Sequence, residues 1–310
     1  MSDYLAAVDC GTNSTRLLIS RDAEQVHQRT IVTGLGRGVD GSGILSGEGI
    51  QRTLDVLRHY ANDLAEFEVE AVRAFATSAV RDAQNAADFI GPAGEILGVE
   101  LETLSGHDEA TLGFNGAISA FDDTDELTLV VDIGGGSTEF ALGRSNLGGA
   151  ISMDMGSVRF TERFVHHDPP EPEELSNLIS MARSYVEEML IELPDAADAA
   201  RLVGLSGTIT TVAAVEIGMD PYDAEQMHLF ELTHEAAEDV FRTLATEPFE
   251  DRQHNPGLAP ERADVIVAGT AILVAIMRAL RFDRCIVSER DLLDGAVASL
   301  VDPPETTAVH

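Results

Sequence analysis

The sequence contains no lysine and no tryptophan, and all 20 of its basic residues are arginine. Without lysine the chain cannot supply the essential side chain of a Walker-type phosphate loop, nor can it form a Schiff base. The 54 acidic residues leave a formal net charge of −34. Such a charge opposes nucleic-acid binding, which requires a cationic surface. We therefore expect a solvated acidic surface and no nucleic-acid partner.

Cysteine and long apolar runs are also scarce. Cys10 and Cys285 both lie in apolar stretches, which predicts two small core side chains and excludes a disulfide framework. The nine histidines show no paired spacing of the kind a zinc site needs, so no zinc is expected. The longest near-apolar stretch, 265–277, is too short to cross a bilayer, and no secretory signal is visible. The expected location is the cytoplasm, without a membrane partner.

The length and the order of predicted elements indicate two domains. A chain of 310 residues exceeds the size at which a single hydrophobic core stops growing. Predicted strands alternate with predicted helices, which is typical of the α/β class. The short acidic segment 121–126 is the best linker candidate. We place the domains at 1–122 and 123–293, with a C-terminal helix of about 294–310 packing on the first domain.

One seven-residue pattern, Asp-x-Gly-x-x-Ser-Thr, occurs twice in the chain. It spans residues 9–15 and 132–138, and each copy lies between two apolar runs that are typical of strands. Chance repetition is the alternative, but the shared context favours duplicated domains that face one another across a cleft. A further glycine-rich stretch, 34–43, lacks the spacing of a dinucleotide-binding loop and is interpreted as a mobile loop.

The glycine-rich loops are suited to anion binding. Glycine lets backbone N–H groups approach a ligand, and successive N–H groups with Ser and Thr hydroxyls form a concavity for phosphate. The segment 206–208 adds a third loop, because it stands where a helix is expected to begin. A tight turn is the alternative for any single loop, whereas three loops after three apolar strands indicate a phosphate chain. The predicted phosphate contacts are Gly11, Thr12, Asn13, Ser14, Thr15, Gly134, Gly135, Gly136, Ser137, Thr138, Ser206, Gly207 and Thr208.

Positive charge for the phosphates must come from arginine. Arg16 directly follows the first loop, and Arg81 lies in a loop-to-helix segment rich in small polar residues. A guanidinium binds phosphate oxygens in a bidentate manner, so both are predicted to contact the substrate. Salt bridges within the protein are the alternative in a chain with this excess of acid.

Carboxylates stand beside the predicted phosphate loops, which implies a cation between them. Asp9, Asp132 and Glu139 are the predicted metal ligands, and Mg²⁺ is the expected ion because it bridges carboxylates to phosphates; Mn²⁺ is the alternative. Turn formation is the other interpretation of Asp9. Asp108 and Glu109, at a predicted strand-to-helix turn, are candidates for a base near the attacking water, and helix capping is the alternative for Asp108.

With these residues in place, the sequence resembles the Ppx/GppA family of exopolyphosphatases and guanosine pentaphosphate phosphohydrolases. The resemblance rests on an ordered set of segments that covers almost the whole chain. These are "VDCGTNSTRLLI", "ATSAVRDAQNAADF", "LSGHDEA", "VVDIGGGSTEF", "GLSGTIT" and "GLAPERADVIVAGTAIL". Single motifs are shared with other actin-like ATPases and sugar kinases (the ASKHA superfamily), but the ordered set is specific.

The resemblance implies an actin-like fold of two RNase-H-like domains with the active site between them. It also implies Mg²⁺-dependent removal of the terminal phosphate from inorganic polyphosphate. By position, Glu109 matches the catalytic Glu that activates water, and Asp132 and Glu139 match the other essential acidic positions. The expected partner is inorganic polyphosphate or guanosine pentaphosphate (pppGpp), and the expected assembly is a homodimer.

Two departures and three alternatives stay open. The family usually has Glu where Asp108 stands, a tolerable change, and the segment "VSERDLLDGAV" leaves the roles of Glu289 and Asp294 undecided. Longer members carry an additional C-terminal helical region that this sequence does not contain. The alternatives to exopolyphosphatase are a pppGpp phosphohydrolase, an actin-like kinase or ATPase, and a non-catalytic phosphate sensor. Intact Glu109, Asp132 and Glu139 argue against the sensor.

Overall fold

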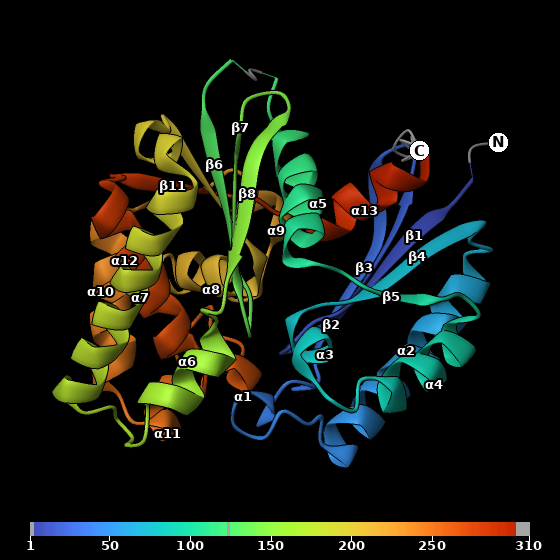
Figure 1. Cartoon of the computed structure of the whole chain (residues 1–310), viewed down its shortest axis with the longest axis horizontal. Coiled ribbons are helices and arrows are strands. Elements are labelled where there is room, and N and C mark those ends of the chain that lie inside the picture. The colour runs from blue at the N-terminus through green and yellow to red at the C-terminus, as the bar shows by residue number, and fades with distance from the viewer. Residues whose placement is uncertain (1–2, 123–124, 302–310) are drawn as a thin grey trace.

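The structure is a computed structural model that describes residues 3–122 and 125–301. Within these ranges the strands form two sheets, one from each half of the chain (Figure 1). The strands of the first sheet are β1 (Leu5–Cys10), β2 (Ser14–Arg21), β3 (Glu24–Val32), β4 (Ala71–Ala76) and β5 (Leu101–Thr103). Those of the second are β6 (Thr128–Ile133), β7 (Thr138–Gly143), β8 (Leu147–Met153), β9 (Arg201–Leu205), β10 (Glu231–Thr233) and β11 (Arg284–Val287).

The two sheets repeat one topology. The first has the order β3-β2-β1-β4-β5, and the second contains the corresponding order β8-β7-β6-β9-β11, with β10 added at its edge. In both, three antiparallel strands are followed by two strands that run parallel to the first of the set. The predicted α/β class is confirmed, and the sequence pattern that occurs twice lies at the same place in each sheet.

The helices surround the two sheets and create the apolar cores. In the first half they are α1 (Val39–Ser42), α2 (Gly47–Glu66), α3 (Ser78–Asp82), α4 (Ala87–Leu97) and α5 (Gly106–Ile118). In the second half they are α6 (Ser157–Phe164), α7 (Pro172–Glu192), η1 (Pro194–Asp198), α8 (Ser206–Glu216), α9 (Ala224–Met227), α10 (His234–Thr246), α11 (Phe249–Arg252), η2 (Pro260–Arg262), α12 (Ile266–Leu280) and α13 (Leu292–Val301). The largest core packs the second sheet against α7, α8, α10 and α12. The first sheet packs against α2 and α4. We call the first sheet with α1 to α4 the N-terminal lobe, and the second sheet with α6 to α12 the C-terminal lobe.

Two helices are exchanged between the lobes. Helix α5, from the first half of the chain, packs its apolar side chains on the second sheet, whereas α13, from the end of the chain, packs on the first sheet. The two helices lie side by side between the lobes (Figure 1). Their contact requires glycine, because a Cβ at Gly116 would overlap the Asp291 carbonyl and one at Gly295 would overlap the Leu112 carbonyl. The chain therefore crosses between lobes twice beside the site described below.

Some of the domain boundaries predicted from the sequence fall on residues that the structure does not describe. The limit after residue 122 falls on 123–124, and the end of the expected C-terminal helix falls on 302–310, both outside the described residues. The division into 1–122 and 123–293 stays a prediction. Among the described residues, no helix combines the length and the apolar character that a membrane span needs.

Candidate active site

The site is built around two β-hairpins, one in each lobe. In the N-terminal lobe, β1 and β2 place Asp9 directly opposite Arg16. In the C-terminal lobe, β6 and β7 place Asp132 directly opposite Glu139. Each copy of the sequence pattern thus begins with an acid, and the residue that directly follows the pattern has opposite charge in the two copies, Arg16 in the first and Glu139 in the second.

The hairpin turns have the same backbone geometry. The N–H of Gly11 donates to the Ser14 carbonyl at 3.0 Å, and the N–H of Gly134 donates to the Ser137 carbonyl at 3.0 Å. The next two amides of each turn, at Thr12 and Asn13 and at Gly135 and Gly136, donate to no other group in the part of the chain that the structure describes. Such free successive amides form an anion-binding concavity.

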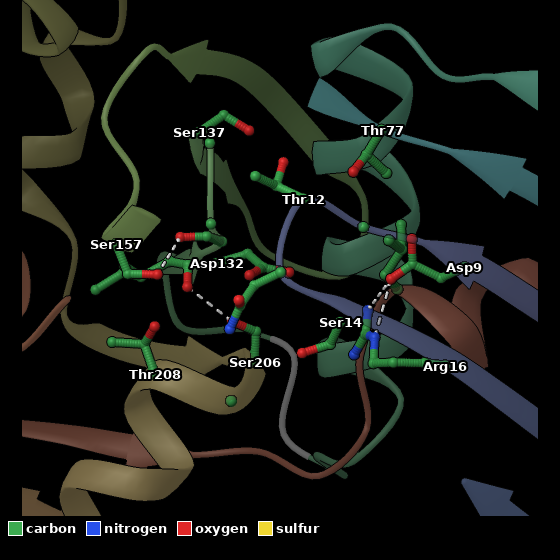
Figure 2. Close-up of a pocket in the computed structure, with 18 of the residues that line it drawn as sticks. Asp9, Thr12, Ser14, Arg16, Thr77, Asp132, Ser137, Ser157, Ser206 and Thr208 are labelled. Atoms are coloured by element: carbon green, nitrogen blue, oxygen red, sulfur yellow. Dashed lines mark hydrogen bonds and ion pairs between the residues drawn. The ribbon is translucent and has the colours of Figure 1, made fainter. Parts of the chain in front are cut away.

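Close packing against the N-terminal lobe explains why Gly135 and Gly136 of the second turn have no side chain. A Cβ at Gly136 would clash with the Ser78 hydroxyl, and one at Gly135 would lie 3.0 Å from Cβ of Thr12. Thr12 and Ser78 belong to the N-terminal lobe, so side chains of one lobe fill the space that the glycines of the other leave. The turns face one another across a pocket of about 580 Å³, which we call the interlobe pocket (Figure 2).

Helix α8 closes a third side of the interlobe pocket. It begins at Ser206, whose backbone has a left-handed φ of 69° and whose hydroxyl donates to the Ile133 carbonyl at 2.9 Å. A Cβ at Gly207 would overlap the guanidinium of Arg262, so this arginine lies directly on the first turn of α8. The amides of a first turn have no partner in the helix and carry partial positive charge. The Arg262 guanidinium and the N-terminus of α8 therefore bring positive charge to the same side of the pocket.

The guanidinium of Arg262 has no ion pair or hydrogen bond with any residue in the described ranges. Burial lowers the pKa of its guanidinium, and the positive charge of Arg16 lowers it further. A half-buried cation beside a helix N-terminus is unfavourable without an anion. The arrangement is therefore complementary to a phosphate group, which would supply that anion.

Arg16 is held between two carboxylates. Its Nε donates to Oδ2 of Asp9 at 2.9 Å, as Figure 2 shows. Its Nη1 pairs with Asp291, the residue directly before α13. Burial alone would lower the pKa of Arg16, but Asp291 and Asp9 outweigh it and the net shift is upward. Its charge is largely neutralised within the protein.

The acidic side chains of the site are crowded and withdrawn from water. Burial raises the pKa of Asp132 to about 6, against the opposing effect of Arg16. Burial and the neighbouring charge of Asp132 raise the pKa of Glu139 to about 7, although the Ser152 hydroxyl donates to it at 2.7 Å. Burial also raises the pKa of Asp9 despite its pair with Arg16. These carboxylates would be stabilised by a cation.

Glu109 approaches the interlobe pocket from the first turn of α5. The helix is capped by Ser105, whose hydroxyl accepts from the Asp108 N–H at 3.1 Å and donates to its carboxylate at 2.6 Å. Asp108 is exposed in the first turn of the helix, whereas Glu109 is only 9% exposed and lines the pocket. Burial raises the pKa of Glu109 well above its ordinary value; Glu139 adds to the rise, and Arg81 opposes it.

Most of the residues predicted to contact phosphate meet in the interlobe pocket. Its lining contains Gly11, Thr12, Asn13, Ser14, Arg16, Gly134, Gly135, Gly136, Ser137, Ser206, Gly207 and Thr208, together with Asp9, Glu109 and Asp132. Sequence reasoning missed three polar lining residues: Thr77, Ser157 and Arg262. Arg262 lies in the quoted segment "GLAPERAD", but nothing local in that segment marks its side chain as part of a pocket.

Four predicted site residues do not line the pocket. Thr15 and Thr138 point away from it, because their hydroxyls bond to Thr33 at 3.0 Å and to the Met155 carbonyl. Arg81 lies behind Glu109, where its Nη1 pairs with that carboxylate at 3.2 Å. Glu139 lies buried behind Asp132.

Comparisons with known proteins agree with this geometry. The profile of the Ppx/GppA phosphatase family matches residues 18–303. Exopolyphosphatase 2 of Mycobacterium tuberculosis is 38% identical over 96% of this chain and 98% of its own length. This chain belongs to the Ppx/GppA phosphatase family.

Further relatives within the family include proteins named for different substrates. A solved structure described as an exopolyphosphatase-like protein superposes with a TM-score of 0.92, at 33% identity over 96% of this chain and 98% of that one. The guanosine-5'-triphosphate,3'-diphosphate pyrophosphatase of Vibrio atlanticus is 30% identical over 96% of this chain and 59% of its own length. The predicted family and its α/β fold are confirmed, and this member of the Ppx/GppA family is a phosphoanhydride hydrolase.

The Ppx/GppA site has oxygen atoms that suit a divalent cation, but not the predicted set of three ligands. Oδ1 of Asp9 is buried without a hydrogen-bond partner, and Asp132 lines the same pocket with a raised pKa. In the described ranges no three His, Cys, Asp or Glu side chains come together as a metal site. Mg²⁺ commonly binds one or two carboxylates, with water and substrate phosphate completing its shell. Asp9 and Asp132 fit that mode.

Proposed function

We propose that this Ppx/GppA protein is an exopolyphosphatase that removes the terminal phosphate of inorganic polyphosphate with a base-activated water. The observation that carries the proposal is that Glu109 lines the same pocket as the two facing hairpin turns. The turns offer free amides from both lobes, and the first turn of α8 offers more. A buried carboxylate is thus available where phosphate-binding groups converge.

The terminal phosphates would lie between the two turns. The amides of Thr12, Asn13, Gly135 and Gly136 would donate to phosphate oxygens, and Arg262 would add a charged, bidentate donor. Such preorganised donors stabilise the charge that spreads over the transferred phosphoryl group. Arg16 would contribute less than predicted, because it is already paired with Asp9 and Asp291.

Glu109 would act as the general base. In the reaction, the water oxygen bonds to the terminal phosphorus while the bond from that phosphorus to the bridging oxygen breaks. The proton of the water passes to the Glu109 carboxylate, and the shortened chain leaves with the electron pair. A raised pKa makes a carboxylate a better proton acceptor once it is ionised. Arg81, paired with Glu109, would orient it.

A divalent cation, Mg²⁺ or Mn²⁺, would be held by Asp9 and Asp132 and would neutralise part of the phosphate charge when bound. It would also relieve the repulsion among the carboxylates and lower their pKa values. Glu139 would support Asp132 from behind rather than bind the cation directly. The homodimer and the cytoplasmic location stay predictions of the same proposal.

Hydrolysis of pppGpp is a second candidate, and one feature of the structure favours it. A wide groove continues from the interlobe pocket, lined by uncharged hydrogen-bonding side chains such as Gln28 and Asn255 and by the aromatic ring of Tyr222. Tyr222 is 47% exposed. Such a wall would suit a nucleoside attached to the phosphates.

The test compares Glu109→Gln with its neighbour Asp108→Asn. We expect Glu109→Gln to lower kcat for polyphosphate by roughly 10²- to 10⁴-fold, the usual contribution of a general base. Asp108 only stabilises the first turn of α5, so Asp108→Asn should keep kcat within about threefold and cost less than about 1 kcal/mol of stability. Thermal unfolding would verify that both variants fold. Equal kcat values for the two variants would refute the role of Glu109.

A further inference from the structure

The groove beside the interlobe pocket carries a distribution of charge that bears on substrate length. It shares Arg16, Ser206, Gly207 and Arg262 with the pocket. One wall is the edge strand β3 of the N-terminal lobe, and the other is α8 with residues 253–262 of the C-terminal lobe. A chain longer than the pocket would leave through this groove.

Basic side chains stand only at the inner end of the groove. Arg16 and Arg262 line both the pocket and the groove, and no other arginine lines the groove among the described residues. Farther along, the ionisable side chains are the acids Asp220, Glu261 and Glu289, with one imidazole at His254. Asp220 and Glu261 are exposed at the rim. Asp291 also lines the inner end and pairs with Arg16, so Arg262 is the unpaired arginine there among the described residues, and the groove becomes anionic toward its rim.

The surface beyond the groove offers no compensation. The 54 acidic residues outnumber the 20 arginines, and many arginines are already paired with acids, as Arg159 is with Asp40 and Asp82. Proteins that bind long polyanions use extended basic surfaces that release counterions from the phosphates. Here every phosphate outside the pocket would meet a net negative field, screened over about 8 Å at physiological salt.

Resting on the function proposed above, we propose that charge restricts this enzyme to short polyphosphates, whose few phosphates all fit within the inner end of the site, where Arg262 and the free amides lie. The acids Asp220, Glu261 and Glu289 act as the specificity-determining residues. A short chain gains the amides of the two turns and Arg262. A long chain gains the same contacts, and its trailing phosphates add repulsion.

The first experiment measures kcat/KM per chain end for tripolyphosphate and for long-chain polyphosphate at fixed free Mg²⁺ and several salt concentrations. At low salt we expect a preference of about tenfold or more for tripolyphosphate. Added salt should raise kcat/KM for the long chain, because it screens repulsion. Preference for the long chain, or a long-chain rate that falls with salt, would overturn the inference. If neither substrate is hydrolysed, the proposed function itself fails.

The second experiment reverses charge in the groove. Glu261→Arg should raise the ratio of long-chain to short-chain kcat/KM by about three- to tenfold, since it replaces repulsion of the trailing phosphates by attraction. Glu188→Arg, at an exposed position of α7 outside the groove, makes the same change in net charge and should leave the ratio within about twofold. Glu261→Gln, a milder change, should shift the ratio in the same direction. Equal shifts at positions 261 and 188 would refute a role for the groove.

Discussion

The two hairpins share a backbone but differ at one decisive position. In the N-terminal lobe Arg16 stands opposite Asp9, and in the C-terminal lobe Glu139 stands opposite Asp132. Arg16 pairs with Asp9 and Asp291, so the first hairpin neutralises its own acid. The second hairpin sets acid against acid, and the pKa of Glu139 rises to about 7 through burial and the charge of Asp132.

This difference shows how a duplicated element can divide a task. The same turn supplies amides from both sides, and the residue directly after the pattern decides the local charge. The first hairpin provides a counterion for its acid and leaves one oxygen of Asp9 without a partner among the described residues, whereas the second sets two acids together, whose negative charge a proton or a metal cation can relieve. Substitutions at the equivalent positions should therefore change stability in opposite directions.

The largest expected effect is that of Arg16→Gln. It leaves Asp9 and Asp291 buried without a cation, and removal of one partner of a buried ion pair costs about 3–5 kcal/mol. Urea unfolding at neutral pH measures the loss. Arg58→Gln, which breaks an exposed pair with Asp55, is the matched control and should cost less than about 1 kcal/mol. A similar cost for both would mean that the first hairpin does not depend on its arginine.

Glu139→Gln should have the opposite sign above neutral pH. A rise of the pKa from 4.5 to about 7 means that the folded state holds a proton more tightly than the unfolded state. At 1.36 kcal/mol per pKa unit, Glu139 contributes about 3 kcal/mol that is fully present below pH 4.5 and is lost as pH rises through about 7. Without divalent metal, Glu139→Gln should therefore be more stable than the wild type at pH 8, by up to this amount.

The measurement is the free energy of unfolding of both proteins at pH 5.5 and pH 8, with EDTA and then with Mg²⁺. Added Mg²⁺ should stabilise the wild type at pH 8, since it binds only the folded state. The variant should have lower activity because Asp132 loses the neighbouring carboxylate of Glu139, which adds negative charge to the proposed cation site. If the two proteins lost the same stability between the two pH values, the raised pKa of Glu139 would not be the cause.

Gly136→Ala tests the contact between the hairpins. Its Cβ would clash with the Ser78 hydroxyl, and overpacking of this kind costs about 1–3 kcal/mol. Activity should fall as well, because the two turns would move apart. The second substitution Ser78→Ala removes the clashing atom and should restore part of both losses. Gly41→Ala, where a Cβ would meet nothing within 4 Å, is the control.

Local pattern was enough to predict much of this site. The repeated Asp-x-Gly-x-x-Ser-Thr pattern located both hairpins, because glycine and small hydroxyl residues after an apolar strand are a local signal. Asp9 and Asp132 were identified as the first residues of the two copies, and Glu109 from a predicted strand-to-helix turn and the family resemblance. Local signals predicted the α/β class correctly, and the structure places these three residues in one pocket.

Contacts between distant segments could not be predicted in this way. Arg262 lies on Gly207 only because η2 folds back over the start of α8. Arg16 was expected to bind phosphate, but α13 brings Asp291 to it from the far end of the chain. The stretch 34–43, interpreted as a mobile loop, contains α1, and its Asp40 forms ion pairs with Arg159 and Arg163 of the other lobe.

The two threonines of the pattern give the smallest expected effect. Side chains of a strand alternate between its faces, so Thr15 points away from the pocket that Ser14 and Arg16 line. Thr138 likewise donates to the Met155 carbonyl inside the C-terminal lobe. Thr138→Val should cost about 1 kcal/mol of stability, the usual net contribution of one hydrogen bond, and should leave kcat within about twofold.

Ser137→Ala, at the adjacent position that does line the pocket, supplies the contrast to Thr138→Val. Its hydroxyl also hydrogen-bonds to the Glu139 carboxylate, and because the residue lines the pocket its removal should raise KM more than it lowers stability. Phosphate release and thermal unfolding, measured on both variants, separate the two roles. A tenfold loss of kcat in Thr138→Val with unchanged stability would indicate that this threonine contacts the substrate after all. The repeated pattern would then act through all of its hydroxyl residues rather than through the alternate ones that face the pocket.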